Sequence, residues 1–202
     1  MVTSIEAPRA VERREYEIGE IVVDNVDIVR RIVDLARQIA RDYEGKEVML
    51  VGIMEGASDT MTYLMQALHK ERLYRIDKAS IAIGSYGSKT TSDEKPVITQ
   101  DLIKNPTGKH VIVVDDVVDS GKTLHFAEGW IRDKGAQSVT TLALVDKRGR
   151  RQVHYSPTYI GFIVNDPNLW LQGFGMDSMG IGRGDPHIRR GPYDYRGTPS
   201  ST

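Results

Sequence analysis

Residues 111–124 constrain the fold more than any other part of this chain. They read Val-Ile-Val-Val-Asp-Asp-Val-Val-Asp-Ser-Gly-Lys-Thr-Leu. The four apolar residues 111–114 are typical of a buried strand in a parallel sheet. The stretch from residue 124 is rich in apolar residues and predicts the start of a helix. A strand, a glycine-containing turn and a helix N-terminus together form an anion site, because backbone N–H groups point outward and the helix dipole favours negative charge.

The polar residues between this strand and this helix define the ligand further. Ser120 and Thr123 add hydroxyl donors to the turn. Three carboxylates just upstream would repel a bare phosphate, so we expect a ligand that also carries hydroxyls, a divalent metal or a group that must lose a proton. The generic alternative is the P-loop, but only residues 121–123 match it, and Asp116 stands where its first glycine belongs. The remaining alternative is a strand whose polar turn simply caps a helix.

Composition indicates a single soluble globular domain. The chain has 202 residues, of which 40% are hydrophobic and 27% charged. The net charge of −1 gives no global basic field for nucleic acid. No apolar run approaches the roughly 18 to 20 residues that span a bilayer, and residues 1–14 lack the apolar core of a secretory signal. The chain has no cysteine, which excludes disulfides, thiol catalysis and cysteine-ligated zinc and fits a cytoplasmic protein.

Hydrophobic spacing predicts alternating helices and strands. Helices are predicted over residues 26–43, 59–68 and 124–134, and strands over 47–54, 78–85, 111–114, 139–145 and 159–164. This alternation indicates an α/β fold with a mostly parallel sheet and right-handed crossovers. We expect a loose arm over residues 1–15, one domain over 16–190 and a disordered tail over 191–202. Residues 85–96 are polar and predict a long flexible loop.

Four separated segments together resemble one enzyme family. Residues 111–124 resemble the ribose-phosphate fingerprint of the type I phosphoribosyltransferases, which bind 5-phosphoribosyl-1-pyrophosphate. Three more segments are similar to the 6-oxopurine, or hypoxanthine-guanine, branch of that family: Ser85-Tyr86, Asp146-Lys147-Arg148, and residues 170–177 followed by Arg183. The resemblance covers roughly residues 15–190. It implies the type I phosphoribosyltransferase fold, a mostly parallel sheet flanked by helices, with a small C-terminal hood largely within residues 153–190.

The resemblance also implies a reaction. A nitrogen of hypoxanthine or guanine attacks ribose C1 of phosphoribosyl pyrophosphate, and pyrophosphate leaves, giving IMP or GMP in purine salvage. Mg²⁺ is the implied cofactor, because it neutralises the leaving group through oxygen ligands. Asp115 and Asp116 match the acids that hold the ribose hydroxyls, partly through metal. The 5′-phosphate cradle is matched by Ser120, Gly121, Lys122 and Thr123.

Further residues are assigned by the same resemblance to the purine and to catalysis. Asp119 matches the acid near the purine N7, where it can act as general base or electrostatic partner; its alternative is a helix N-cap. Lys147 matches the donor to the exocyclic O6, and its alternative is a solvated lysine in a charged turn. Trp170 matches the aromatic residue that stacks on the base, and its alternative is a core aromatic. Leu171 is expected to offer backbone groups to the base edge.

The pyrophosphate side contains one departure from the family pattern. Asp177 matches a second acid on the metal side, and Arg183 matches the arginine that contacts pyrophosphate. Ser85 and Tyr86 match the start of the active-site lid. Where the family commonly has Lys-Gly-Gly, this chain has Glu55-Gly56-Ala57. Gly56 keeps room for close backbone approach. Glu55 places a negative charge beside the pyrophosphate, so we expect the Glu55 side chain to turn away or to bind a metal or a neighbouring subunit.

Three other functions are compatible with the sequence. One is a phosphoribosyltransferase that prefers xanthine, since xanthine shares O6 with guanine. Another is a nucleotide-sensing regulator on the same fold that binds RNA, and a third is a structural ribose-phosphate-binding module. Asp119 and Lys147 favour catalysis. The sequence leaves open the preferred base, and helix surfaces such as 59–68 predict a homodimer or a homotetramer.

Overall fold

The computed structural model describes residues 19–86, 95–177 and 180–191. The predicted N-terminal arm and C-terminal tail lie outside these residues, apart from Gly191, and so does most of the predicted loop over residues 85–96. None of the helices in the described part of the chain combines the length and apolar character that crossing a bilayer requires.

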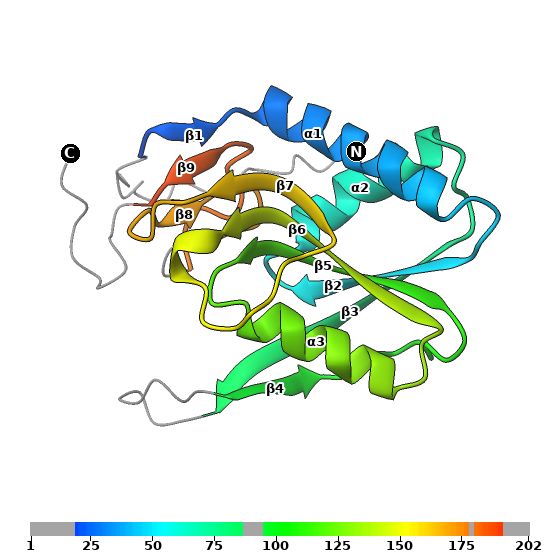
Figure 1. Ribbon diagram of the computed structural model, residues 1–202. Helices are drawn as coiled ribbons and strands as arrows, with labels where there is room; N and C mark the ends of the chain where they lie inside the picture. Colours follow the sequence, from blue (N-terminus) through cyan, green and yellow to red (C-terminus); the bar gives the residue numbers. More distant parts are fainter. Residues whose placement is uncertain (1–18, 87–94, 178–179, 192–202) are drawn as a thin grey trace, which may run out of the picture.

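A six-stranded sheet forms the centre of the molecule (Figure 1). Its strands are β2 (Val48–Met54), β3 (Ile76–Tyr86), β4 (Lys95–Gln100), β5 (His110–Val118), β6 (Ser138–Lys147) and β7 (Tyr159–Val164). They lie in the order β4-β3-β2-β5-β6-β7, and every neighbouring pair is parallel except β3 and β4. The predicted mostly parallel α/β sheet is therefore confirmed.

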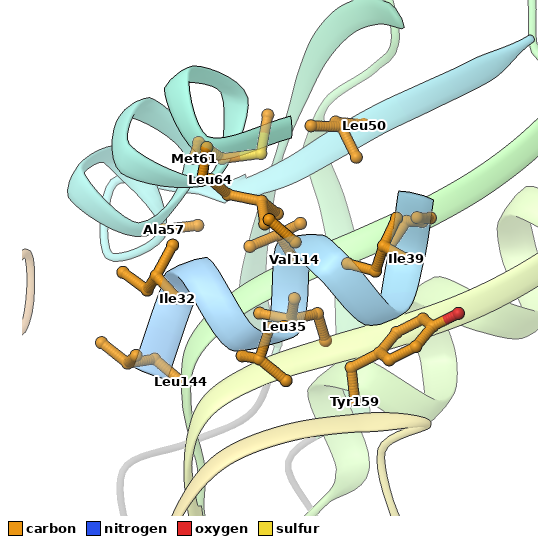
Figure 2. Close-up of a cluster of buried hydrophobic side chains, with 14 of the residues drawn as sticks. Ile32, Leu35, Ile39, Leu50, Ala57, Met61, Leu64, Val114, Leu144 and Tyr159 are labelled. Carbon is orange, nitrogen blue, oxygen red and sulfur yellow. The ribbon is translucent and has the colours of Figure 1, made fainter. Parts of the chain in front are cut away.

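Helices cover both faces of this sheet. Helices α1 (Asn25–Asp42) and α2 (Ser58–Lys70) lie on one face, and α3 (Lys122–Asp133) lies on the other (Figure 1). Asp24 is the N-cap of α1, because its carboxylate accepts a hydrogen bond of 2.8 Å from the Val26 N–H. The apolar stripe of α1 explains its position: Ile32, Leu35 and Ile39 are buried against α2 and the sheet (Figure 2).

A second, small sheet closes one end of the molecule. It consists of β1 (Ile21–Val23), β8 (Leu171–Gln172) and β9 (Ile188–Arg190), in the order β1-β9-β8. Strand β1 pairs with β9, with Ile21 opposite Arg189. The predicted hood over residues 153–190 thus contains β8 and β9, but its sheet also uses a strand from the N-terminal end of the described chain.

The predicted loop over residues 85–96 is wrong at both ends. Strand β3 continues to Tyr86, and β4 begins at Lys95, so the two strands form an antiparallel hairpin with Ser85 opposite Pro96. Proline removes a backbone donor, and it is tolerated here because β4 is the edge strand. The intervening residues 87–94 lie outside the described part.

Candidate active site

The predicted site residues meet at the carboxyl ends of the central strands. Strand β2 is followed in the chain by β3 on one side, whereas β5 lies on its other side, so the strand order reverses between β2 and β5. Ligands bind in open α/β sheets outside the carboxyl ends of the strands at such a reversal. Gly56 follows β2, Asp115 and Asp116 lie near the end of β5, and Lys147 ends β6.

Two adjacent carboxyl groups lie at the centre of this site. Asp115 and Asp116 are only 7% and 9% exposed. Burial raises the pKa of Asp115 well above its ordinary value, and the neighbouring Asp116 carboxylate adds to the effect. Burial also raises the pKa of Asp116, although the Val117 N–H and the Arg183 cation act in the opposite direction. Two desolvated carboxylates side by side favour a ligand that brings a positive charge or hydroxyl donors.

The polar turn forms a hollow beside these acids. Gly121 is the N-cap of α3 and has a φ of 83°, a left-handed conformation that favours glycine. The Lys122 N–H donates to the Ser120 hydroxyl over 3.3 Å. The hollow has a volume of about 230 Å³, and it is lined by Asp115, Val117, Val118, Asp119, Ser120, Gly121, Thr123 and Leu124. Four of the predicted phosphate and ribose residues, Asp115, Ser120, Gly121 and Thr123, therefore share one hollow at a helix N-terminus.

A second hollow contains the residues predicted for the base. It has a volume of about 130 Å³ and is lined by Asp116, Val117, Asp119, Lys147, Trp170, Leu171, Met176 and Asp177. Lys147 is only 4% exposed, and its Nζ lies 6.0 Å from the centroid of the Trp170 ring. Burial lowers the pKa of Lys147, and the Asp119 carboxylate opposes that shift. Lys147 is thus a buried cation facing a pocket, and its alternative interpretation as a solvated lysine is wrong.

Asp119 is the acidic side chain that lines both hollows. Its Oδ1 lies 3.9 Å from Lys147 Nζ, and its Oδ2 lies 3.1 Å from Arg150 Nη1. The N-cap of α3 is Gly121, so the alternative interpretation of Asp119 as a helix cap is wrong. A carboxylate at the junction of the two hollows is close to any bond that would form between a ligand in one and a ligand in the other.

The turn after β2 packs directly on the acids. A Cβ added to Gly56 would lie 2.6 Å from Oδ1 of Asp116 and closer still to Oδ2, so a side chain there would displace the carboxylate or the turn. A Cβ added to Gly175 would likewise overlap the carbonyl oxygen of Gly56. This contact holds the 170–177 segment of the hood against the turn.

Arg183 organises the remaining acids at this edge. Its Nη2 lies 2.6 Å from Asp177 Oδ1, and its Nη1 donates to the Gly175 carbonyl over 2.6 Å. Glu55 is 80% exposed, and its Oε2 lies 3.9 Å from Arg183 Nε. The unexpected anion at this turn therefore faces a cation of the hood. Asp177 and Asp116 line the same hollow.

Sequence analysis missed two arginines at this site, Arg150 and Arg151. Arg150 pairs with Asp119, as described above. Arg151 pairs with the buried Asp146, and its Cδ would lie 2.9 Å from a Cβ added to Gly121. The only sequence signal was a cluster of basic residues after Lys147, which is equally typical of a solvated turn. For Ser85 and Tyr86 the structure gives the backbone at the end of β3, and their side chains lie outside the described residues.

The acids fit a magnesium ion that the ligand helps to hold. Mg²⁺ usually keeps several waters and binds one or two carboxylates together with substrate phosphates. The described residues contain no group of three or more side chains that could hold a metal ion by themselves. Asp115 and Asp116 offer buried carboxylate oxygens whose mutual repulsion a cation would offset. This donor set suits a metal that arrives with a phosphorylated ligand.

Comparison with known proteins gives the family. A family model described as the phosphoribosyl transferase domain matches residues 19–179. The chain belongs to this family. The hypoxanthine-guanine phosphoribosyltransferase of Streptococcus thermophilus is 31% identical over 163 residues, which are 81% of this chain and 87% of that protein. The crystal structure of a hypoxanthine-guanine phosphoribosyltransferase from Bacillus anthracis has a TM-score of 0.79 at 30% identity, covering 87% of this chain and 99% of that one.

Another relative within the phosphoribosyl transferase family is much longer. The bifunctional protein TilS/HprT of Listeria monocytogenes is 30% identical over 177 residues, which are 88% of this chain. These residues are 26% of the Listeria protein, so the chain spans about a quarter of that relative's length. The fold and the family predicted from sequence are both confirmed by these comparisons.

Proposed function

We propose that this phosphoribosyl transferase domain moves the 5-phosphoribosyl group from phosphoribosyl pyrophosphate to hypoxanthine or guanine, giving IMP or GMP and pyrophosphate. The observation that carries the proposal is the position of Asp119, which lines both the sugar-phosphate hollow and the base hollow. The bond that forms in this reaction joins a purine nitrogen to ribose C1, and the atoms of that bond belong at such a junction.

Each part of the donor has a matching group. The Ser120–Thr123 turn offers backbone N–H groups and hydroxyls to the 5′-phosphate, and the α3 dipole favours its charge. Asp115 and Asp116 accept hydrogen bonds from the ribose hydroxyls. Arg183 is positioned at the edge of the base hollow by Asp177, where its planar guanidinium suits the leaving pyrophosphate.

The purine site selects by hydrogen bonding. Lys147 carries only donors, so it matches the O6 acceptor of hypoxanthine and guanine and opposes the 6-amino group of adenine. Trp170 provides a flat surface for stacking, and Leu171 lies on β8, an edge strand of the small sheet. As the purine attacks ribose C1, Asp119 accepts a proton from N7 of the base or stabilises the positive charge that develops there.

Mg²⁺ is part of the proposal and would be held by Asp115 and Asp116, with Asp177 nearby. When bound, it neutralises charge on the departing pyrophosphate. We propose that the segment beginning at Ser85 and Tyr86 excludes water during the reaction, because an oxocarbenium-like centre must be kept from water. We also propose that the protein is cytoplasmic and forms a homodimer or a homotetramer, as the sequence predicts.

One assay tests the proposal. Purified protein is given phosphoribosyl pyrophosphate, Mg²⁺ and either hypoxanthine, guanine, xanthine or adenine, and nucleotide formation is followed with Asp119→Asn as the active-site control. Turnover of hypoxanthine or guanine that falls about 10²- to 10⁴-fold in Asp119→Asn supports the proposal. Turnover of xanthine alone supports the xanthine-preferring alternative. Binding of nucleotides without turnover of any purine supports the regulator.

A further inference from the structure

Arg150 contacts the proposed catalytic carboxylate from outside both hollows. Its side chain is 14% exposed, and its Nη1 lies 3.1 Å from Oδ2 of Asp119, whose own side chain is 32% exposed. The residues that line the two hollows, all in the described part of the chain, do not include Arg150. Arg150 therefore approaches Asp119 from behind, relative to the space that the ligands would occupy.

Local backbone geometry explains why Arg150 is directed there. Residues Arg148–Arg150 form a short 3₁₀ helix directly after β6, with Lys147 as its N-cap. A 3₁₀ helix has three residues per turn, so the side chains of Lys147 and Arg150 lie on the same side. Both cations consequently reach the same carboxylate.

The turn is anchored on its other side by a buried acid. Arg148 and Arg151 both form ion pairs with Asp146, which is 1% exposed. The Arg151 guanidinium also donates to the Tyr155 carbonyl over 2.9 Å. These contacts fix the backbone of the turn, so the Arg150 side chain stays close to Asp119.

Lys147 and Arg150 contact different oxygens of the Asp119 carboxylate. Lys147 Nζ is 3.9 Å from Oδ1, too far for a hydrogen bond, and Arg150 Nη1 forms a closer ion pair of 3.1 Å with Oδ2, without hydrogen-bond geometry. Lys147 can thus turn to a base without breaking a hydrogen bond to Asp119. The shorter contact, from Arg150, then remains to orient the carboxylate.

We infer that Arg150 is a positioning residue for the proposed transfer reaction: its ion pair holds Oδ2 of Asp119, so that Oδ1 faces N7 of the base. A carboxylate rotates freely about its last torsion unless one oxygen is fixed. Partial burial makes the pair less screened than a surface ion pair. The Arg150 charge also lies near Lys147, whose pKa it lowers. This inference rests on the proposed function.

Kinetics of Arg150→Met and Arg150→Lys test the inference. Misplacement of a catalytic group by about 1 Å can cost about 100-fold in rate, so we expect Arg150→Met to lower kcat about 10- to 100-fold. The KM values for phosphoribosyl pyrophosphate and hypoxanthine should change by less than about threefold, because Arg150 does not line either hollow. Arg150→Lys keeps the charge and should recover much of the turnover. The control is Arg37→Met, which removes an exposed arginine of α1 that pairs with Asp34 away from the site and should leave kcat little changed.

A double-mutant cycle separates positioning from a structural role. In an Asp119→Asn background the carboxylate is gone, so Arg150→Met should lower kcat by less than about twofold. An equal loss in both backgrounds, or no loss in the wild-type background, would overturn the inference. If Asp119→Asn falls below detection, equal turnover of Arg150→Lys and Arg150→Met at equal Tm overturns it instead. Absence of turnover in the wild-type protein with all four purines would refute the proposed function itself.

Discussion

Gly56 lies directly against the carboxylate of Asp116. A Cβ at Gly56 would approach Oδ1 of Asp116 to 2.6 Å, and Asp116 is buried at the end of β5, where little space is available to move into. The turn after β2 and the acid of β5 are therefore packed without room for one methyl group. This contact joins the proposed pyrophosphate turn to the proposed ribose site.

We predict that Gly56→Ala lowers kcat/KM for phosphoribosyl pyrophosphate by about 100-fold. The methyl group must displace the Asp116 carboxylate or the turn, and a shift of about 1 Å in a binding group has costs of this order. Steady-state kinetics measure the effect. The matched control is Gly129→Ala in the interior of α3, where a Cβ would meet no atom within 4 Å.

Gly129→Ala should keep full activity and stabilise the helix by about 0.5–1 kcal/mol, because alanine loses less conformational entropy than glycine. Thermal unfolding of the two variants checks this difference. Wild-type kcat/KM in Gly56→Ala would show that the turn adapts, and that Gly56 has no special place in donor binding.

The buried carboxyl groups of Asp115 and Asp116 are expected to lower the stability of the fold while they serve ligand binding. The folded pKa of Asp115 is raised above its unfolded value by burial and by Asp116. The contribution of Asp115 to the free energy of unfolding is most favourable below the unfolded pKa of about 3.9. This contribution is lost as the pH rises through the folded pKa. Asp115→Asn removes the charge, so we expect it to raise Tm at pH 8 in metal-free buffer and to lose activity.

The Tm difference between Asp115→Asn and wild type should disappear towards pH 4, where both side chains are neutral. Each kcal/mol added to the free energy of unfolding raises Tm by about 2–4 °C for a chain of this size. The control Asp34→Asn changes a half-exposed carboxylate on α1 that pairs with Arg37, and it should not raise Tm at pH 8 because it relieves no burial. A Tm for Asp115→Asn below that of wild type at pH 8 would mean that the carboxylate makes a net favourable contact.

The centre of the main sheet could be predicted because β2, β5 and most of β6 are buried. Strands such as β5 and β6 read as continuous apolar runs, which have few alternatives in a chain with interleaved helices. Strand β4 was missed because it is polar at an edge and contains Pro96. The small sheet was missed for a different reason. Strands of two or three residues carry no periodicity, and the pairing of Ile21 with Arg189 joins opposite ends of the domain.

The candidate site shows the same division. Asp115, Asp116, Asp119 and the following turn are contiguous, so one motif contains them. Arg150 was missed because its importance depends on the 3₁₀ turn after Lys147, and four basic residues within 147–151 look alike in the sequence. Gly175 was missed because its contact with Gly56 joins segments 119 positions apart. The predicted roles of these residues in binding and catalysis stay predictions.

Trp170 is predicted to bind the base by stacking. The ring is partly exposed, lines the base hollow and lies 6.0 Å from Lys147 Nζ, and a Cβ at Gly191 would lie 2.5 Å from its Cδ1. Trp170→Phe keeps an aromatic face and should be mild, whereas Trp170→Ala should weaken base and nucleotide binding by about 1–3 kcal/mol. Calorimetric titration with IMP measures the change.

The chain contains one other tryptophan, and it serves as the control. Trp130 lies on α3 beside Lys134, whose Nζ is 4.3 Å from the ring centroid. Trp130→Ala should leave IMP affinity unchanged. If Trp170→Ala instead lowers Tm and retains its affinity for IMP, Trp170 is a core residue of the hood.

Lys147 is predicted to decide which purines react. Its ammonium is buried, faces the base hollow and lies 3.9 Å from Oδ1 of Asp119. A 6-oxo group would give it a charge-assisted hydrogen bond, whereas a 6-amino group would oppose two donors and leave a buried charge poorly paired. Because a polar mismatch in a closed site is costly, wild type should discriminate against adenine by about 10³-fold or more in kcat/KM.

Lys147→Ala removes the donor but not the sugar-phosphate hollow. We expect it to raise KM for hypoxanthine and guanine, to weaken the rejection of adenine, and to leave the Kd for phosphoribosyl pyrophosphate within about threefold of wild type, since Lys147 does not line that hollow. Steady-state kinetics with all four purines and a direct binding measurement test this. If wild type uses adenine as well as hypoxanthine, or if Lys147→Ala leaves KM for both 6-oxopurines unchanged, the purine site is assigned wrongly. The phosphoribosyltransferase proposal would survive that result, because it depends on Asp119 and on the hollow beside the Ser120–Thr123 turn.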